Sequence, residues 1–339
     1  MAIVHIAIFD AVNAIEGRYH GYTGLDRADR VASVQAAIAT AAHDTLNALF
    51  PSQSAACDAQ LAEDLARLPQ GRAQRNGIDL GRRAAARILE MRSDDGSFHP
   101  EPLLGVGWFP GDLPGDWRQD PISLNPFAMG AHWGEVRPFV LTSSDQFRVP
   151  PPPPLDSDEY AAAFSEVKEL GGDGVTTPTT RTADQTVAGI YWAYDGTPSL
   201  CAPPRLYNQI ALQIAEQRKT RLVPTARLLA LINVAMADAG IAIWESKYHH
   251  NFWRPVTGVR EAGTDGNPDT IGDPGFSPLG APASNNPAAV NFTPPFPGLS
   301  FGTCRFRRRP VSGAAPLLRD GQHRLHLRVR RVQRRDARA

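Results

Sequence analysis

Apolar residues recur at intervals of three and four along much of the chain, which is the spacing of one face of an amphipathic helix. In the first such segment Val4, Ile8, Val12 and Ile15 share a face, and Gly17 follows as a helix end. The same pattern predicts further helices over 33–49, 54–68, 72–92, 157–170, 182–194, 204–218 and 225–251. No segment shows the two-residue alternation of a strand, so the sequence predicts an all-α fold built as a helical bundle.

The helical pattern breaks between residues 94 and 156, where glycine and proline are dense. So long an irregular connection is uncommon unless it is functional or packs over a domain. It ends in the five prolines of 150–154, which predict a stiff polyproline segment, with a disordered linker between two domains as the alternative. The first helix begins abruptly at the start of the chain, so we expect that an earlier part of the domain is missing.

Cysteine is sparse, and the chain shows no leader. Cys57, Cys201 and Cys304 are widely spaced, which predicts neither a disulfide framework nor a zinc site. Met1 is followed at once by apolar residues without a basic region, so no signal peptide is recognised. The most apolar stretch, 226–244, is interrupted by Arg227 and Asp238, and it predicts a buried helix with no membrane span.

The formal net charge is zero, with 35 Lys+Arg against 35 Asp+Glu. A balanced chain argues against a basic nucleic-acid binder, but the balance is uneven along the sequence. Residues 305–339 hold twelve Arg, no Lys and two Asp, a net charge of +10, which leaves −10 on residues 1–304. We therefore expect a helical domain over 1–297 and an Arg-rich, disordered tail over 298–339.

The stretch from Trp244 to Pro255 holds the most informative chemistry. Lys247 and Arg254 are seven residues apart, which is two helical turns, so a helix through both would place the two cations on one face. A lysine point charge and an arginine fork together suit a tetrahedral oxyanion such as phosphate or vanadate, although cations at this spacing are more often a solvated helix face. Pro255 disfavours helical geometry at Arg254.

Lys-x6-Arg-Pro is also the first of three motifs of the acid phosphatase and vanadium-dependent haloperoxidase superfamily, which is all-helical. Longer segments resemble its bacterial vanadium haloperoxidase-like branch: residues 1–16, the stretch Arg137-Pro-Phe-Val-Leu-Thr-Ser, Asp145-Gln-Phe, the prolines of 150–154, Arg181-Thr-Ala-Asp-Gln and Met236-Ala-Asp-Ala-Gly. The resemblance covers about residues 1–297 and implies the fold of that superfamily, incomplete at the C-terminus.

The resemblance implies an oxidoreductase that uses bound vanadate to oxidise halide with hydrogen peroxide. It assigns Lys247 and Arg254 to the oxygens of vanadate or phosphate, and it suggests Trp244, His250 and Trp253 as residues lining the site. His249 and His250 are not ligands in the family, and as helix neighbours about 100° apart they do not form a zinc site. No resident metal-ion ligand, nucleic-acid partner or oligomer follows from the sequence. Many family members are exported, which leaves the compartment open.

The sequence departs from this family after Pro297. The family places Pro-Ser-Gly-His next and Ser-Arg-x5-His later, and neither motif occurs in this chain. Gly298 to Phe306 can be encoded by GGC CTA TCC TTC GGG ACA TGC CGG TTT, and the same bases read one position later encode Ala-Tyr-Pro-Ser-Gly-His-Ala-Gly. The sequence therefore predicts a frameshift that truncates the family domain and leaves the chain without a complete catalytic site. The alternatives are a phosphatase of the same superfamily, or a non-catalytic helical protein that binds an oxyanion or, through a genuine basic tail, an acidic partner.

Overall fold

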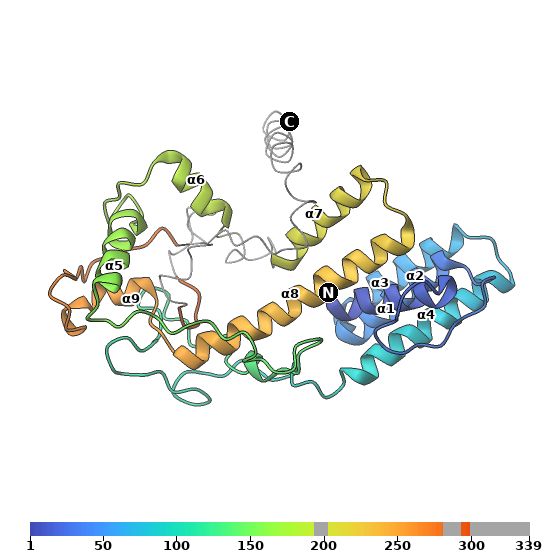
Figure 1. Cartoon of the computed structure of the whole chain (residues 1–339), viewed down its shortest axis with the longest axis horizontal. Helices are drawn as coiled ribbons and strands as arrows, with labels where there is room; N and C mark the ends of the chain where they lie inside the picture. The colour runs from blue at the N-terminus through green and yellow to red at the C-terminus, as the bar shows by residue number, and fades with distance from the viewer. Residues whose placement is uncertain (193–202, 281–292, 299–339) are drawn as a thin grey trace. The chain divides into compact units, whose positions relative to one another are not determined.

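The computed structural model of the chain describes residues 1–192, 203–280 and 293–298, and the described part is helical (Figure 1). The α-helices are α1 (Ala2–Glu16), α2 (Val34–Leu49), α3 (Ser54–Ala66), α4 (Arg72–Met91), α5 (Asp158–Gly171), α6 (Ala183–Trp192), α7 (Pro203–Gln217), α8 (Leu222–His250) and α9 (Pro255–Arg260). Short 3₁₀ turns η1 (Pro51–Gln53), η2 (Trp133–Glu135) and η4 (Ala262–Thr264) join them. Within the described residues β-pairing is limited to isolated bridges, so the all-α prediction is confirmed.

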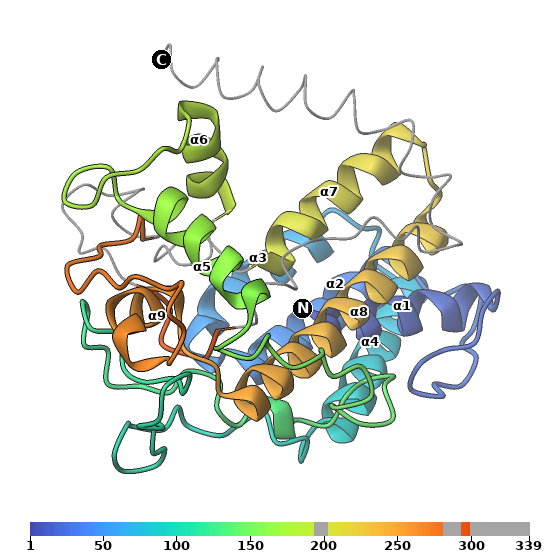
Figure 2. The same ribbon diagram turned by 60° about the vertical axis from the view of Figure 1, so that its left-hand side comes forward.

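Helices α1, α2 and α4 pack together, and α8 lies against α1 (Figures 1 and 2). Their common core is made of small and aliphatic side chains, among them Ile6, Ala37, Leu80 and Ile88. Gly81 lets α4 approach α2 closely, because a Cβ there would lie 2.7 Å from the Ala37 carbonyl oxygen. Burial of these apolar surfaces is the main stabilising contribution to this part of the fold.

The helix ends follow the local signals in the sequence. Gly17 ends α1 in the left-handed conformation at φ 65°, which glycine adopts without strain. Ser33 caps α2 by accepting a hydrogen bond from the Ala36 amide, and Ser157 caps α5 by accepting one from the Tyr160 amide. These boundaries match the expected ones within a few residues; the two end residues expected for the helix at 182–194 lie outside the described residues.

The longest helix, α8, begins three residues earlier than expected. The sequence predicts Pro224 as the residue before the helix, but it occupies the third helical position. Amides in the first turn have no partner within the helix, so a proline there loses no hydrogen bond. By length and composition α8 would suffice to cross a bilayer. However, its buried Asn233 and Asp238 form hydrogen bonds to other parts of the chain, as in the core helix of a folded domain.

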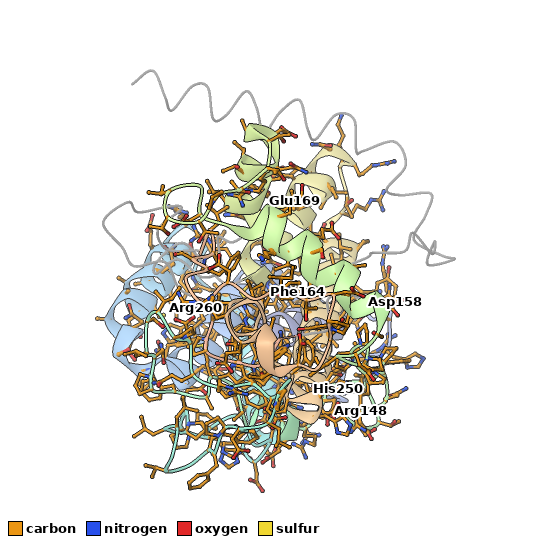
Figure 3. The ribbon with its side chains drawn as sticks, turned by 90° about the vertical axis from the view of Figure 1, so that its left-hand side faces the viewer. Arg148, Asp158, Phe164, Glu169, His250 and Arg260 are labelled. Atoms are coloured by element: carbon orange, nitrogen blue, oxygen red, sulfur yellow. The ribbon has the colours of Figure 1, made fainter. Side chains whose placement is uncertain are left out.

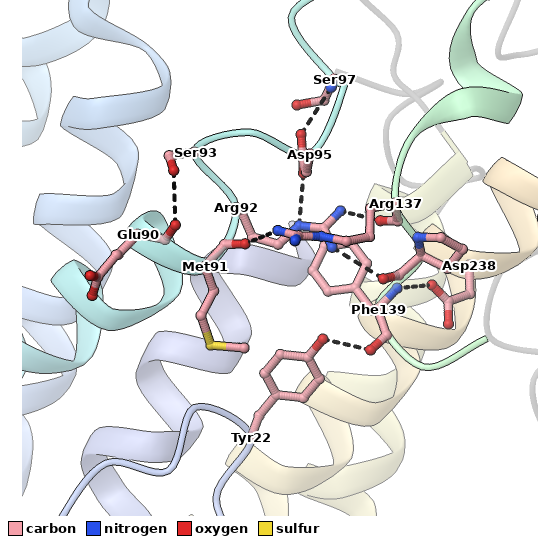
Figure 4. A network of polar contacts seen from close by, with 11 residues as sticks. Tyr22, Glu90, Met91, Arg92, Ser93, Asp95, Ser97, Arg137, Phe139 and Asp238 are labelled. Atoms are coloured by element: carbon pink, nitrogen blue, oxygen red, sulfur yellow. Dashed lines mark hydrogen bonds and ion pairs between the residues drawn. The ribbon is translucent and has the colours of Figure 1, made fainter. Parts of the chain in front are cut away.

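The irregular connection after α4 is fixed by polar contacts to the helices. Asp238 of α8 accepts hydrogen bonds from the amides of Phe139, Val140 and Leu141, at 2.6, 2.8 and 3.0 Å. Figure 4 shows the first of these bonds. Arg92, at the end of α4, forms a buried ion pair with Asp95 at 2.7 Å and donates to the Arg137 and Pro138 carbonyls. The connection is thus packed on the domain, which disfavours the alternative of a disordered linker.

A second cluster of buried side chains joins α5, α9 and the residues after α8. It contains Tyr160 and Phe164 of α5, Trp253, Val256 and Phe276, and Phe164 is labelled in Figure 3. Arg260 of α9 donates to the Phe276 carbonyl and thereby holds the following loop to the same cluster. This cluster fixes where the chain runs as it leaves α8.

Candidate functional site

Lys247 lies in the last turn of α8, and Arg254 is the residue before α9. Between them Asn251 adopts the left-handed conformation at φ 46°, which ends α8 and turns the chain. The premise that one helix carries both cations is therefore wrong, and their seven-residue spacing does not define a common helix face. A single helix carrying both cations would have to continue through Asn251. The αL conformation of Asn251, together with Pro255, instead breaks the ladder of backbone hydrogen bonds.

The two cations nevertheless come together, at the ring of Phe296. The Lys247 Nζ atom lies 4.8 Å from the centre of this ring, and the Arg254 guanidinium carbon lies 5.2 Å from it. Both distances are within the range of cation–π attraction. Lys247 is only 8 % exposed, and its ammonium group also donates to the Pro297 carbonyl at 3.3 Å. The geometry thus brings one ammonium and one guanidinium group to the same aromatic side chain.

Backbone pairing with distant segments holds the turn that carries Arg254. The Trp117 amide donates to the Asn251 carbonyl at 2.7 Å, and the Gly298 amide donates to the Phe252 carbonyl at 2.8 Å. Gly298 is in close contact with this turn, since a Cβ there would lie 2.7 Å from the Trp253 carbonyl oxygen. The segment 293–298 is therefore seated against the end of α8 through its backbone as well as through Phe296.

Trp244 is the one lining residue expected from the sequence that the structure brings to this pair. Its ring centre lies 5.1 Å from that of Phe296 and 5.8 Å from the Lys247 Nζ atom. Its indole Nε1 donates to the Met129 carbonyl at 3.3 Å. Gly130, at φ 73°, is needed beside it, because a Cβ there would lie 1.9 Å from that nitrogen.

Tyr248 contacts the same turn of the irregular connection as Trp244. Its hydroxyl donates to the Met129 carbonyl at 2.7 Å, and burial, together with the charge of Glu101, raises the pKa of Tyr248. The hydroxyl therefore remains protonated and able to donate at physiological pH. Because the Met129 amide donates to the Pro295 carbonyl at 2.9 Å, this turn of the irregular connection joins α8 to the segment that carries Phe296.

The structure places His250 and Trp253 elsewhere. His250 bonds through Nε2 to the Val149 carbonyl at 2.8 Å, beside the ion pair of Arg148 and Glu245 (Figure 3). Trp253 is fully buried in the cluster with Tyr160 and Phe164. Both residues support the end of α8 rather than sharing the contacts of Lys247. Among the residues the structure describes, no three His, Cys, Asp or Glu side chains form a possible metal-ion site.

The sequence analysis did not predict a role for Phe296, although this residue directly precedes Pro297, after which the second motif is expected. The only signal was that position. The two cations and Phe296 fit an oxyanion in two respects. Lys and Arg side chains are donors only, and the rings of Trp244 and Phe296 lower the local dielectric and strengthen attraction to an anion. This donor set suits the oxygens of a tetrahedral anion.

Known proteins similar to this chain include vanadium-dependent haloperoxidases. Residues 227–306 match a family model described as the second helical-bundle domain of VCPO. The chain is 37 % identical over 232 residues to the vanadium chloroperoxidase of Curvularia inaequalis, an alignment that covers 63 % of this chain and 35 % of that protein. The chain thus spans about a third of the length of this relative.

Two solved structures share the fold. One is described as the first bacterial vanadium-dependent iodoperoxidase, with a TM-score of 0.66, 22 % identity and coverage of 88 % of this chain and 70 % of that one. The other is a holo-type bacterial vanadium-dependent chloroperoxidase, with a TM-score of 0.55, 18 % identity and coverage of 76 % and 62 %. The chain is thus similar in sequence to a vanadium chloroperoxidase and in fold to two bacterial vanadium-dependent enzymes, and the end of α8 lies within the residues that match the model of the second helical-bundle domain.

Proposed function

We propose that Lys247 and Arg254 bind the oxygens of vanadate in a haloperoxidase-like site, and that phosphate, which has the same shape and charge type, competes for it. The observation that carries this proposal is the convergence of the two cations on Phe296 from opposite sides of the turn at Asn251. The names of the relatives, which are vanadium-dependent, support vanadate over other oxyanions.

Each residue has a separate part in holding the anion. The Lys247 ammonium supplies a compact charge from a buried position, and the Arg254 guanidinium supplies parallel N–H donors for two oxygens. The rings of Trp244 and Phe296 keep water from the cations, so the attraction is stronger than on a solvated surface. Vanadate, when bound, supplies the chemistry by which haloperoxidases oxidise halide with peroxide.

We also propose that this chain does not complete that reaction, because a frameshift has replaced the residues after Pro297. The shifted codons give Ala-Tyr and then the missing Pro-Ser-Gly-His. The contacts of Phe296 and Pro297 with Lys247 support in-frame sequence up to this point. The +10 charge of residues 305–339 is what a GC-rich gene yields when read out of frame.

Two other functions use the same cations. A phosphatase of the superfamily would hold phosphate in the same place, and a non-catalytic protein would bind an oxyanion without turnover. Phosphate binding alone does not separate these from a haloperoxidase site, whereas vanadate-dependent halide oxidation by the restored-frame protein does. Sequencing the gene across codons 298–306 tests the frameshift directly, and a shifted frame without Pro-Ser-Gly-His would refute it.

Vanadate and phosphate binding to the chain as it stands tests the site itself. We expect Lys247→Gln to weaken vanadate binding at least tenfold by titration calorimetry, because the anion no longer contacts the buried positive charge of the lysine. Lys168→Gln is the matched control, because this ammonium group bonds to the Ile271 carbonyl far from α8 in sequence, and binding should not change. Equal weakening by both variants, or by neither, would contradict the proposed site.

A further inference from the structure

His43, a residue of α2, lies outside the site described above, and its ring contacts two carboxylates. The His43 Nδ1 atom lies 2.7 Å from Oδ1 of Asp44, and the Nε2 atom lies 2.7 Å from Oδ1 of Asp58. Asp44 follows His43 on α2, whereas Asp58 belongs to α3. The His43 side chain is 15 % exposed and that of Asp58 is 62 % exposed, so the ring bridges the two helices at the surface of the bundle.

The two carboxylate contacts favour the doubly protonated ring. An ionised carboxylate only accepts hydrogen bonds, so each ring nitrogen must carry a proton to bond at these distances. The ring is then an imidazolium, and each bond is charge-assisted. Asn47 of α2 completes the cluster: its amide nitrogen lies 3.0 Å from the His43 Nε2 atom and donates to Oδ1 of Asp58 at 3.2 Å, which helps to hold this carboxylate in place.

Helix α3 depends on such a bridge because it is weakly anchored otherwise. Not one of its residues is buried, in contrast to α4, which buries Leu80, Ala84 and Ile88 against the same bundle. The main contacts of α3 are made to α2 and η1, and the Gln74 side chain donates to the Leu65 carbonyl at its end. Little hydrophobic burial therefore opposes the release of this helix.

We propose that His43 is a proton-operated latch: the doubly protonated ring ties α3 to α2 through Asp44 and Asp58, and loss of one proton releases α3. A neutral imidazole donates from one nitrogen only, so it faces one of the two carboxylates with a lone pair. The second bond is then replaced by repulsion between lone pairs. The latch opens on a rise in pH and closes again when the proton returns.

The charges around the ring set the direction of this response. Burial lowers the pKa of His43, but the hydrogen bonds to Asp58 and Asp44 outweigh it, so the pKa is raised. The same bond from His43, with that from Asn47, lowers the pKa of Asp58. No charged residue occurs in η1, and α4 meets α2 through Gly77 and Gly81, while its Arg82 and Arg87 pair with Asp79 and Glu90 of the same helix.

Linkage then gives the pH window. Because the pKa of His43 is raised in the docked state, its contribution to docking is complete below the unfolded value near 6.5 and is lost as the pH rises through the raised value. Because the pKa of Asp58 is lowered, its contribution is present above the unfolded value near 3.9 and is lost at more acidic pH. Docking of α3 is strongest between these two limits.

Hydrogen exchange of the full chain at pH 6 and pH 9, corrected for intrinsic rates, measures the latch. Protection of α3 amides, relative to α4 amides in the same sample, should fall about tenfold for each unit by which docking raises the pKa. Asp58→Asn keeps an acceptor but removes the charge, and it should flatten this pH dependence. Glu63→Gln, on an exposed residue of α3 that pairs with Arg67, should leave it unchanged.

Nitrogen NMR of the His43 ring provides an independent measurement. At pH 6 both ring nitrogens should give imidazolium shifts in the unmodified chain, and Asp58→Asn should lower the pH of the transition. A neutral ring at pH 6, or protection of α3 that is equal at both pH values, would overturn the proposal. Retention of the full pH dependence in Asp58→Asn would also overturn it.

Discussion

The packed helices α1, α2 and α4 and the irregular connection between α4 and α5 are held together by different interactions. The helices meet through small and aliphatic residues such as Ala37, Gly81 and Ile88, with backbone hydrogen bonds satisfied inside each helix. The connection has little regular secondary structure. Single side chains such as Asp238 and Arg92 therefore bind several of its backbone groups (Figure 4). The first region should be sensitive to added volume and the second to the loss of one polar group.

The largest expected effect is in the connection. Asp238→Ala leaves the amides of Phe139, Val140 and Leu141 without their common acceptor, and the loss of three charge-assisted bonds should lower the free energy of unfolding by about 3–4 kcal/mol. Urea denaturation measures this change. Asp79→Ala, on the exposed face of α4, is the control and should change it by less than about 0.5 kcal/mol. A loss below about 1 kcal/mol for Asp238→Ala would show that the connection is held by other contacts.

A smaller effect is expected among the helices. Gly81→Ala adds a Cβ that would lie 2.7 Å from both the Ala37 carbonyl oxygen and the Thr40 Cβ atom, so α2 and α4 must move apart. We expect a net loss of about 2 kcal/mol in the same denaturation experiment, because overpacking outweighs the better helix propensity of alanine. Gly263→Ala, where a Cβ would contact nothing within 4 Å, is the control. A stabilised Gly81→Ala would mean that the two helices are not in close contact.

The smallest effect is expected for the serine N-caps, which occur both among the packed helices and after the connection. Ser33 caps α2, and Ser157 caps α5 just after the five-proline run, each by accepting an amide hydrogen bond. Ser33→Ala and Ser157→Ala should each cost about 1 kcal/mol by thermal denaturation, since a cap acts locally. Conservative Ser→Thr replacement at each site should retain most of the stability. Unequal losses would show that the surroundings of the cap, and not the cap alone, set its contribution.

Periodicity and local end signals predicted most helices, because an α-helix satisfies its own backbone within a few residues. Gly17, Ser33 and Ser157 act where the sequence places them. The start of α8 was less predictable: a proline is compatible both with the residue before a helix and with its first turn. The course of the connection was beyond prediction, since its partners, such as Asp238 for residues 139–141, are about one hundred positions away.

The candidate site likewise combines local features of the sequence with contacts between distant residues. The two cations of Lys-x6-Arg-Pro and the change in composition after Pro297 can be recognised from the residues alone. The position of Arg254 beyond the end of α8, and the meeting of both cations at Phe296, became visible in the folded chain. Helix formation is local, whereas the turn at Asn251 is positioned by backbone bonds to Trp117 and Gly298 from distant parts of the chain. Those bonds, not the seven-residue spacing, bring the two charges together.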